Sequence, residues 1–169
     1  MTDLSAATAE FTVLAFAGLL IAAAASDWRK LTIPNRYSLA IVALFPSYAI
    51  ATGAGIDWSA HLLFGAASFV IGFVLFALRL CGGGDVKLFA AVALWAGPAL
   101  MLPMTFYVAV AGGLMATVLW FHHRLQRAGS AVNFMYTQSE EGFAKQPMPY
   151  AVAIAAGGLF VALQLLMGA

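Results

Sequence analysis

Residues 88–121 read LFAAVALWAGPALMLPMTFYVAVAGGLMATVLWF and contain no Asp, Glu, Lys or Arg. As one straight helix, these 34 residues would extend roughly 51 Å, whereas the hydrocarbon core of a bilayer is about 30 Å thick. Gly97-Pro98 and Pro103 lie inside the stretch, and both residue types interrupt helices. The stretch is therefore predicted to form two membrane-spanning helices, 88–102 and 104–121, joined by a turn.

Apolar segments of similar character occur on both sides of this stretch. With the two just described there are six, and they cover residues 11–25, 37–52, 58–80, 88–102, 104–121 and 150–167. A spanning helix needs about 20 mostly apolar residues, so the shorter segments must extend into flanking polar residues. The sequence predicts an all-α, polytopic membrane protein with six transmembrane helices in a single domain, residues 1–169.

The overall composition excludes several classes of protein. Of the 169 residues, 63% are hydrophobic and 9% are charged, and the mean hydropathy is +0.93. A soluble domain carries about 25% charged residues, so a water-soluble enzyme is excluded. A net charge of +1 argues against a nucleic-acid partner. The single cysteine, Cys81, excludes a disulfide framework and a CxxC zinc site.

Basic residues mark one side of the membrane. They occur between alternate pairs of segments, as Arg29, Lys30 and Arg36, then Arg79 and Lys87, then Arg124, Arg127 and Lys145. By the positive-inside rule, these loops are cytoplasmic and both termini lie on the outer, periplasmic side. The first segment also has a rival interpretation as a signal peptide. A signal peptide begins with basic residues, whereas residues 2–10 carry only Asp3 and Glu10 as charges, so the segment is predicted to be a true span.

Two aspartates stand at the cytoplasmic ends of predicted helices. Asp27 ends the first apolar segment, and Asp85 precedes the fourth, directly after Gly82-Gly83-Gly84. Two carboxylates in close contact share a proton, and such a pair can activate water while polarising a carbonyl. Glycines beside the pair would permit unusual backbone conformations and leave room for an extended peptide. A structural interpretation stays open, in which Asp27 pairs with a neighbouring basic residue and Asp85 caps a helix.

The segments around the two aspartates resemble a known family. The run Gly82-Gly83-Gly84-Asp85-Val86-Lys87 is similar to the GxGD motif of the type IV prepilin peptidases, extended by a lysine. Residues 27–35, DWRKLTIPN, resemble the segment around the first catalytic aspartate of that family. Residues 149–153, PYAVA, resemble another recurrent feature, with Ala151 where glycine is usual.

This resemblance implies an aspartic endopeptidase of the bacterial inner membrane. It would remove the leader peptide from type IV pilin-like precursors at the cytoplasmic face, through an activated water and without a metal or cofactor. Asp27 and Asp85 would be the catalytic pair, and Gly82 and Gly84 the glycines of the motif. The short chain resembles the Flp/Tad branch, which lacks the methyltransferase domain, so a peptidase alone is expected. The sequence leaves the oligomeric state open.

Other polar residues receive supporting roles. Pro34 and Asn35 are expected to begin the second helix and thereby support the placement of Asp27. Lys87 either tunes the local field and meets substrate, or anchors the helix at the membrane surface. Gly83 is expected to help shape the site. Glu140 and Glu141 are candidate contacts for a basic leader, while solvation is the simpler interpretation.

Two alternative functions use the same aspartates. One is a presenilin-like protease that cuts within the membrane, although that group carries its aspartates deep inside two spans. The other is a proton- or ion-conducting protein, for which acids near the membrane midplane are expected. Both alternatives fit less well with aspartates at the ends of spans.

Overall fold

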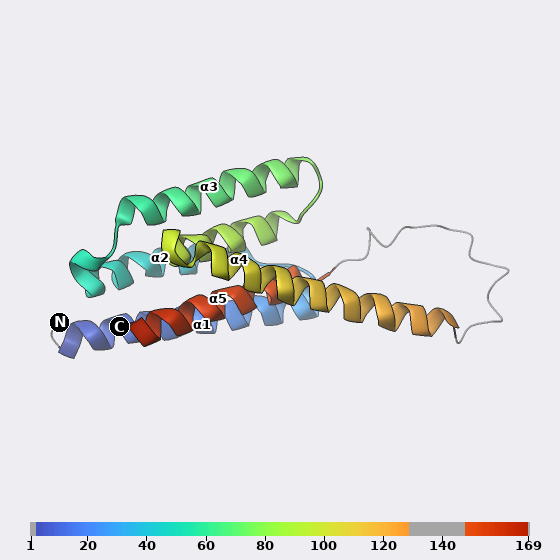
Figure 1. Ribbon diagram of the computed structural model, residues 1–169, viewed down its shortest axis with the longest axis horizontal. Coiled ribbons are helices and arrows are strands. Elements are labelled where there is room, and N and C mark those ends of the chain that lie inside the picture. The colour runs from blue at the N-terminus through green and yellow to red at the C-terminus, as the bar shows by residue number, and fades with distance from the viewer. Residues whose placement is uncertain (1–2, 129–147, 169) are drawn as a thin grey trace.

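The computed structural model describes residues 3–128 and 148–168, and every regular element in this part of the chain is helical (Figure 1). The elements are α1 (Asp3–Lys30), α2 (Asn35–Thr52), the 3-10 turn η1 (Gly53–Gly55), α3 (Trp58–Ala77), α4 (Gly83–Ala128) and α5 (Tyr150–Gly168). The predicted all-α class is thus confirmed for the described residues.

The helix α4 is broken inside the stretch that was predicted to form two spans. Gly97 has φ 55° and ψ −166°, which is not helical, and the chain reverses direction there (Figure 1). The predicted break is therefore confirmed, but its position is corrected. Residues 98–102, expected to complete the fourth segment and its turn, are helical and belong to the second part of α4 together with Pro103. One missing N–H costs a helix a single hydrogen bond, and Pro103 is accommodated at that cost.

A histidine from α3 compensates for the broken backbone at this turn. Pro98 has no N–H to donate to the carbonyl of Leu94, its natural partner four residues earlier. The Nδ1 of His61 lies 2.8 Å from that carbonyl oxygen and donates to it. The His61 ring also covers Gly97, where an added Cβ would lie 2.8 Å from Nδ1. Gly97 is needed both for its positive φ and for this close approach.

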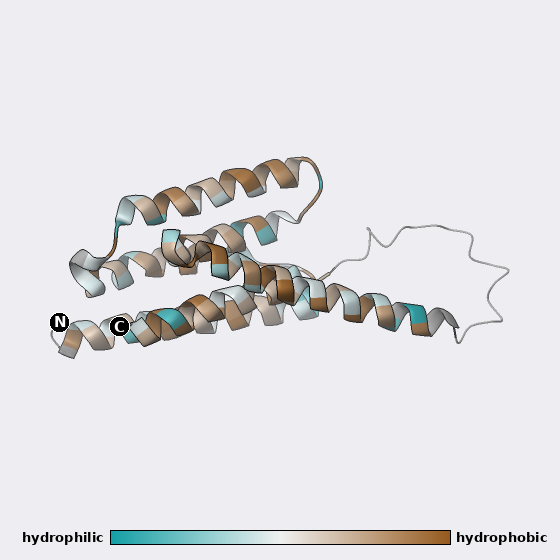
Figure 2. Cartoon of the chain, viewed as in Figure 1, coloured by the Kyte–Doolittle hydropathy of each residue, from teal (hydrophilic) through white to brown (hydrophobic). Residues whose placement is uncertain are grey.

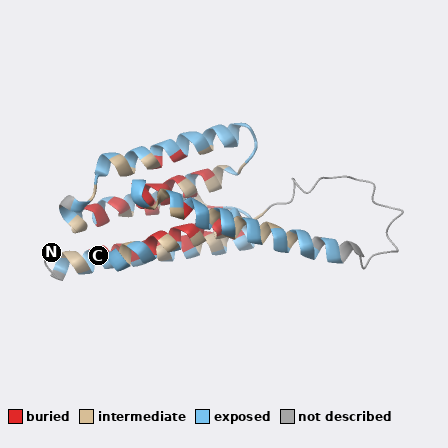
Figure 3. Cartoon of the chain, in the orientation of Figure 1, coloured by how far each residue is buried: buried red, intermediate tan, exposed pale blue. Residues whose placement is uncertain are grey.

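Among the described residues, four helices are long and apolar enough to cross a membrane. They are Leu4–Lys30, Trp58–Ala77, Gly83–His122, which contains the break, and Tyr150–Gly168. Hydrophobic residues predominate along α3 (Figure 2), and most of that helix is exposed, while the buried residues face inward from α2, α4 and α5 (Figure 3). An apolar exterior of this extent is typical of a protein whose solvent is lipid. Six membrane crossings and the side on which the termini lie stay predictions.

The core is built around Trp95 of α4. Its ring stacks on Phe16 of α1 with centroids 4.4 Å apart, and on Tyr48 of α2 at 5.2 Å. Its Nε1 donates to the carbonyl of Ile41 at 2.9 Å, so the buried indole has a hydrogen-bond partner. One side chain thereby joins three helices, and it holds the first part of α4 against α1 and α2.

The connections gather at the two ends of the bundle. The loops before α2 and α4 and the start of α5 lie at one end, whereas both termini, η1 and the turn at Gly97 lie at the other (Figure 1). At the latter end, Asp57 caps α3 by accepting from Ser59 Oγ at 2.6 Å and Ala60 N at 3.2 Å. The hydrogen bonds from Ser59 and then Ala60 lower the pKa of Asp57. The other end contains the predicted site.

Candidate active site

Asp27 and Asp85 line the same cavity, which has a volume of about 250 Å³. The rest of its wall comes from the two segments next to them, with Leu31, Thr32 and Ile33 of the loop after α1 on one side, and Gly82 and the first α4 residues, Gly83 and Gly84, on the other. The two carboxylates repel each other electrostatically. The structure thus brings together two acids that are far apart in the sequence.

Asp27 is held rigidly at the end of α1. Its side chain is only 5% exposed, and Oδ2 accepts a hydrogen bond of 3.0 Å from the backbone N–H of Ala151. Its own carbonyl accepts from Leu31 N at 2.8 Å, and Leu31 has a φ of 50°, the left-handed conformation that ends many helices. The turn at Leu31 ends α1 one helical turn after the aspartate, and the loop residues that follow line the cavity.

Asp85 lies in the first turn of α4, where the helix dipole favours a negative charge. Its side chain is half-buried and interacts with the backbone of Gly82, the residue before the helix. A carboxylate that reaches back in this way satisfies a free N–H at the helix start. This position is compatible with the capping role considered for Asp85, and it lies beside Asp27 in the wall of the cavity.

The three residues before Asp85 are glycines because neighbouring atoms leave little room for a side chain there. Within the described residues, the glycines with positive φ are Gly53 and Gly97, so the expectation of unusual backbone conformations at residues 82–84 is wrong. An added Cβ on Gly82 would lie 2.7 Å from Asp85 Oδ2, and one on Gly84 would lie 3.1 Å from the Cβ of Ile33. An added Cβ on Gly83 would lie 3.3 Å from Cε2 of the Phe76 ring. Side chains at these positions would displace the Asp85 carboxylate, or push the start of α4 away from Ile33 and from Phe76.

Pro34, Asn35 and Lys87 link the two segments that carry the aspartates. Pro34 is the N-cap of α2 with φ −60° and ψ 135°, and α2 begins at Asn35, as predicted. Lys87 Nζ donates to Asn35 Oδ1 at 3.0 Å. The lysine therefore contacts the first residue of α2, directly after the loop that follows α1, an arrangement that neither of its predicted roles had included.

The remaining candidates have simpler positions. Arg29 and Lys30 are exposed, and the Asp27 carboxylate accepts a hydrogen bond from the α5 backbone. Glu140 and Glu141 lie outside the described residues. No group of three His, Cys, Asp or Glu side chains that could hold a metal ion occurs within the described residues.

Cys81 borders the site without the properties of a nucleophile. Burial raises the pKa of its thiol, and the charge of Asp85 raises it further. Reactive cysteines have lowered pKa values, because the thiolate is the attacking form. The surroundings of Cys81 therefore do not favour a nucleophilic role.

One contributor to the site could not be recognised from the sequence. The donor to Asp27 is the main chain of Ala151, and any residue except proline supplies a backbone N–H. The signal available was the stretch Pro149-Tyr150-Ala151 itself. Pro149 directly precedes α5, so it sets where the free N–H groups of this helix begin.

Comparisons with known proteins identify relatives of this chain. A family model described as the type IV leader peptidase family matches residues 14–117, a range that includes both aspartates. The prepilin leader peptidase/N-methyltransferase of Bacillus subtilis (strain 168) is 28% identical over 155 residues, which are 90% of this chain and 55% of that protein. The chain thus spans about half the length of this curated relative. No solved structure matches it.

Proposed function

Since the chain belongs to the type IV leader peptidase family, we propose that it is a membrane-embedded aspartic endopeptidase that removes the leader from type IV pilin-like precursors. Asp27 and Asp85 are its catalytic pair. The observation that carries this proposal is the cavity that both carboxylates line, with three glycines on its wall. The expected Flp/Tad class of substrate belongs to the same proposal.

The chemistry follows from two acids that share one proton. The ionised carboxylate takes a proton from a water molecule as the water oxygen attacks the scissile carbonyl carbon. The protonated carboxyl group donates to the carbonyl oxygen and stabilises the negative charge that develops there. Transfer of a proton to the amide nitrogen then lets the C–N bond break, and both acids return to their starting state. This sequence needs no covalent intermediate.

The proposed orientation puts the aspartate end of the bundle at the cytoplasmic face of a bacterial inner membrane. Basic residues flank this end at the close of α1 (Arg29 and Lys30), the start of α2 (Arg36), the loop before α4 (Arg79) and the start of α4 (Lys87). A cytoplasmic excess of Lys and Arg supports this orientation. With α4 divided at Gly97, the chain would cross the membrane six times.

A direct test uses the purified protein, reconstituted in vesicles with a candidate pilin precursor. The proposal predicts a product whose mass equals that of the precursor without its leader. Vesicles loaded with a pH-sensitive dye test ion conduction in the same preparation. An intact precursor together with a collapsing proton gradient would contradict the peptidase proposal and favour the ion-conducting alternative.

A further inference from the structure

A second cavity runs beside the candidate site, between three helices. It has a volume of about 420 Å³, and α2, α3 and α4 each contribute four residues to its lining. We call it the three-helix groove. Its residues are Asn35, Ser38, Leu39 and Val42, then Leu62, Gly65, Ala66 and Phe69, and finally Lys87, Ala90, Ala91 and Leu94. The helix α3 packs on α4 (Figure 1) and meets α2 near the Gly97 turn, where Phe45 contacts Trp58 and His61, and the groove lies between the three helices on the side of Asn35.

The groove has apolar walls and a floor of small residues. Large side chains rise from α2 and α3, and they are well exposed, with Leu39 at 67% and Leu62 at 56%. The floor includes Ala90 and Ala91 of α4, which are 8% and 1% exposed. Small residues let another helix approach a backbone closely inside a membrane. The shape therefore suits an apolar helix lying along the groove.

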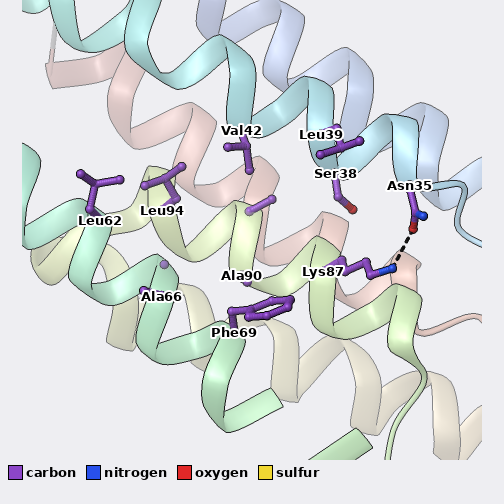
Figure 4. Close-up of a pocket in the computed structure, with 12 residues that line it drawn as sticks. Asn35, Ser38, Leu39, Val42, Leu62, Ala66, Phe69, Lys87, Ala90 and Leu94 are labelled. Atoms are coloured by element: carbon purple, nitrogen blue, oxygen red, sulfur yellow. Dashed lines mark hydrogen bonds between the residues drawn. The ribbon is translucent and has the colours of Figure 1, made fainter. Parts of the chain in front are cut away.

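One end of the groove is polar (Figure 4). Lys87 and Asn35 form their hydrogen bond there. Ser38 lines the same end and is 6% exposed, yet its Oγ has no hydrogen-bond partner among the described residues. A buried hydroxyl without a partner is costly in an apolar setting. The polar end thus offers donors to a ligand that brings its own acceptors.

This polar end adjoins the aspartate cavity. Asn35 follows the loop residues 31–33 that line the cavity, and Lys87 lies two residues after Asp85. The same two segments therefore border both spaces. A chain that leaves the groove at its polar end therefore meets the segments that line the aspartate cavity.

We propose that the three-helix groove binds an apolar helix that follows the leader in the precursor, an inference that rests on the proposed function. The leader junction leaves the groove as extended chain, and its backbone carbonyls, which have no helical partners, accept from Ser38 and Lys87. A phospholipid also offers apolar chains together with head-group acceptors. The adjoining aspartate cavity favours a polypeptide as the occupant, because the two segments that border the groove at its polar end also border the cavity that Asp27 and Asp85 line.

Photocrosslinking tests the occupant directly. A benzoylphenylalanine at Leu62, in the groove wall, is compared with one at Leu63, which is 65% exposed and does not line the groove. With a purified pilin precursor in vesicles, the probe at Leu62 is expected to capture the precursor and the probe at Leu63 is not. Capture of phospholipid alone at Leu62, or equal capture of the precursor at both positions, would overturn the proposal.

A blocking variant links the groove to cleavage. Ala66→Phe fills the groove, whereas Ala67→Phe adds the same side chain one residue later, outside it. We expect Ala66→Phe to lower kcat/KM for the full precursor about tenfold, because the apolar helix loses its seat, and Ala67→Phe to leave it unchanged. Equal activity of the two variants would contradict the assignment.

The two proposals fail in different ways. Specific capture at Leu62 without leader removal by the unmodified protein would leave the groove assignment standing and overturn the proposed peptidase function. Leader removal without specific capture at Leu62 would overturn the groove assignment and leave the proposed peptidase function standing.

Discussion

The backbone N–H of Ala151 donates a hydrogen bond to Oδ2 of Asp27 at 3.0 Å. The first turn of α5 thereby holds a carboxylate that belongs to α1, 124 residues away in the sequence. Both residues are buried, at 0% and 5% exposure. The contact orients Asp27 through a residue that belongs to neither of the two aspartate motifs.

Ala151→Pro removes this donor, while the first turn of a helix tolerates proline. The variant is expected to lose about 10- to 100-fold in kcat with little change in KM, because substrate contacts persist while the carboxylate loses its orientation. Ala151→Gly keeps the N–H and serves as the matched control, with near-normal kcat. A proline variant that retains normal kcat would show that the hydrogen bond does not position Asp27 for catalysis.

Gly82→Ala introduces a methyl group 2.7 Å from Asp85 Oδ2. Since that distance is too short for a stable contact, the carboxylate must move, and leader removal is expected to fall at least about tenfold. Gly113→Ala is the control, because no atom lies within 4 Å of the added methyl group. Precursor processing at matched membrane levels of protein measures the effect. Equal rates for both variants would argue against the steric role of Gly82.

Gly97→Ala tests the break in α4. The φ of 55° disfavours an alanine by about 1–2 kcal/mol, and the His61 ring above it adds a steric cost. We expect lower thermal stability in detergent, read from the loss of helical circular dichroism. Gly55→Ala is the control, since its added methyl group contacts nothing. If Gly97→Ala unfolds at the same midpoint temperature as the unmodified protein, the turn does not require glycine.

Cys81 provides a prediction about pH. Because the pKa of its thiol lies above the ordinary 9.0, the thiol stays protonated at neutral pH and ionises only as the pH rises beyond that value. Alkylation by a maleimide is expected to be slower than for a free cysteine at pH 7 and to accelerate in strongly alkaline buffer. Mass spectrometry of the intact protein measures the modified fraction. Rapid alkylation at pH 7 would contradict this description.

Local patterns predicted much of this architecture. Apolar runs located the helices, and Gly97-Pro98 revealed the break in α4 because proline and glycine act on the backbone where they stand. Pro103 misled the prediction, since a proline inside a helix is tolerated when packing outweighs one lost hydrogen bond. His61 went unnoticed because its partner, the Leu94 carbonyl, becomes free only through the break at Pro98.

The candidate site also combines residues that local patterns predict with contacts that they do not. Both aspartates were found because charges in apolar sequence are few and stood at corresponding helix ends. The Ala151 contact and the bond between Lys87 and Asn35 depend on tertiary packing, which no local pattern records. The glycines at residues 82–84 line the cavity together with both aspartates, but the conformational reason predicted for them is wrong, and the atoms that crowd them come partly from Ile33 and Phe76.

The most direct test of the account compares three aspartate variants in cells that express a pilin precursor. Asp27→Asn and Asp85→Asn preserve size and remove the shared proton chemistry, while Asp57→Asn alters an acid at the opposite end of the bundle, where asparagine still caps α3. At equal membrane levels, we predict that the first two abolish leader removal and that Asp57→Asn leaves it intact. Normal leader removal by Asp27→Asn or Asp85→Asn would contradict the catalytic pair.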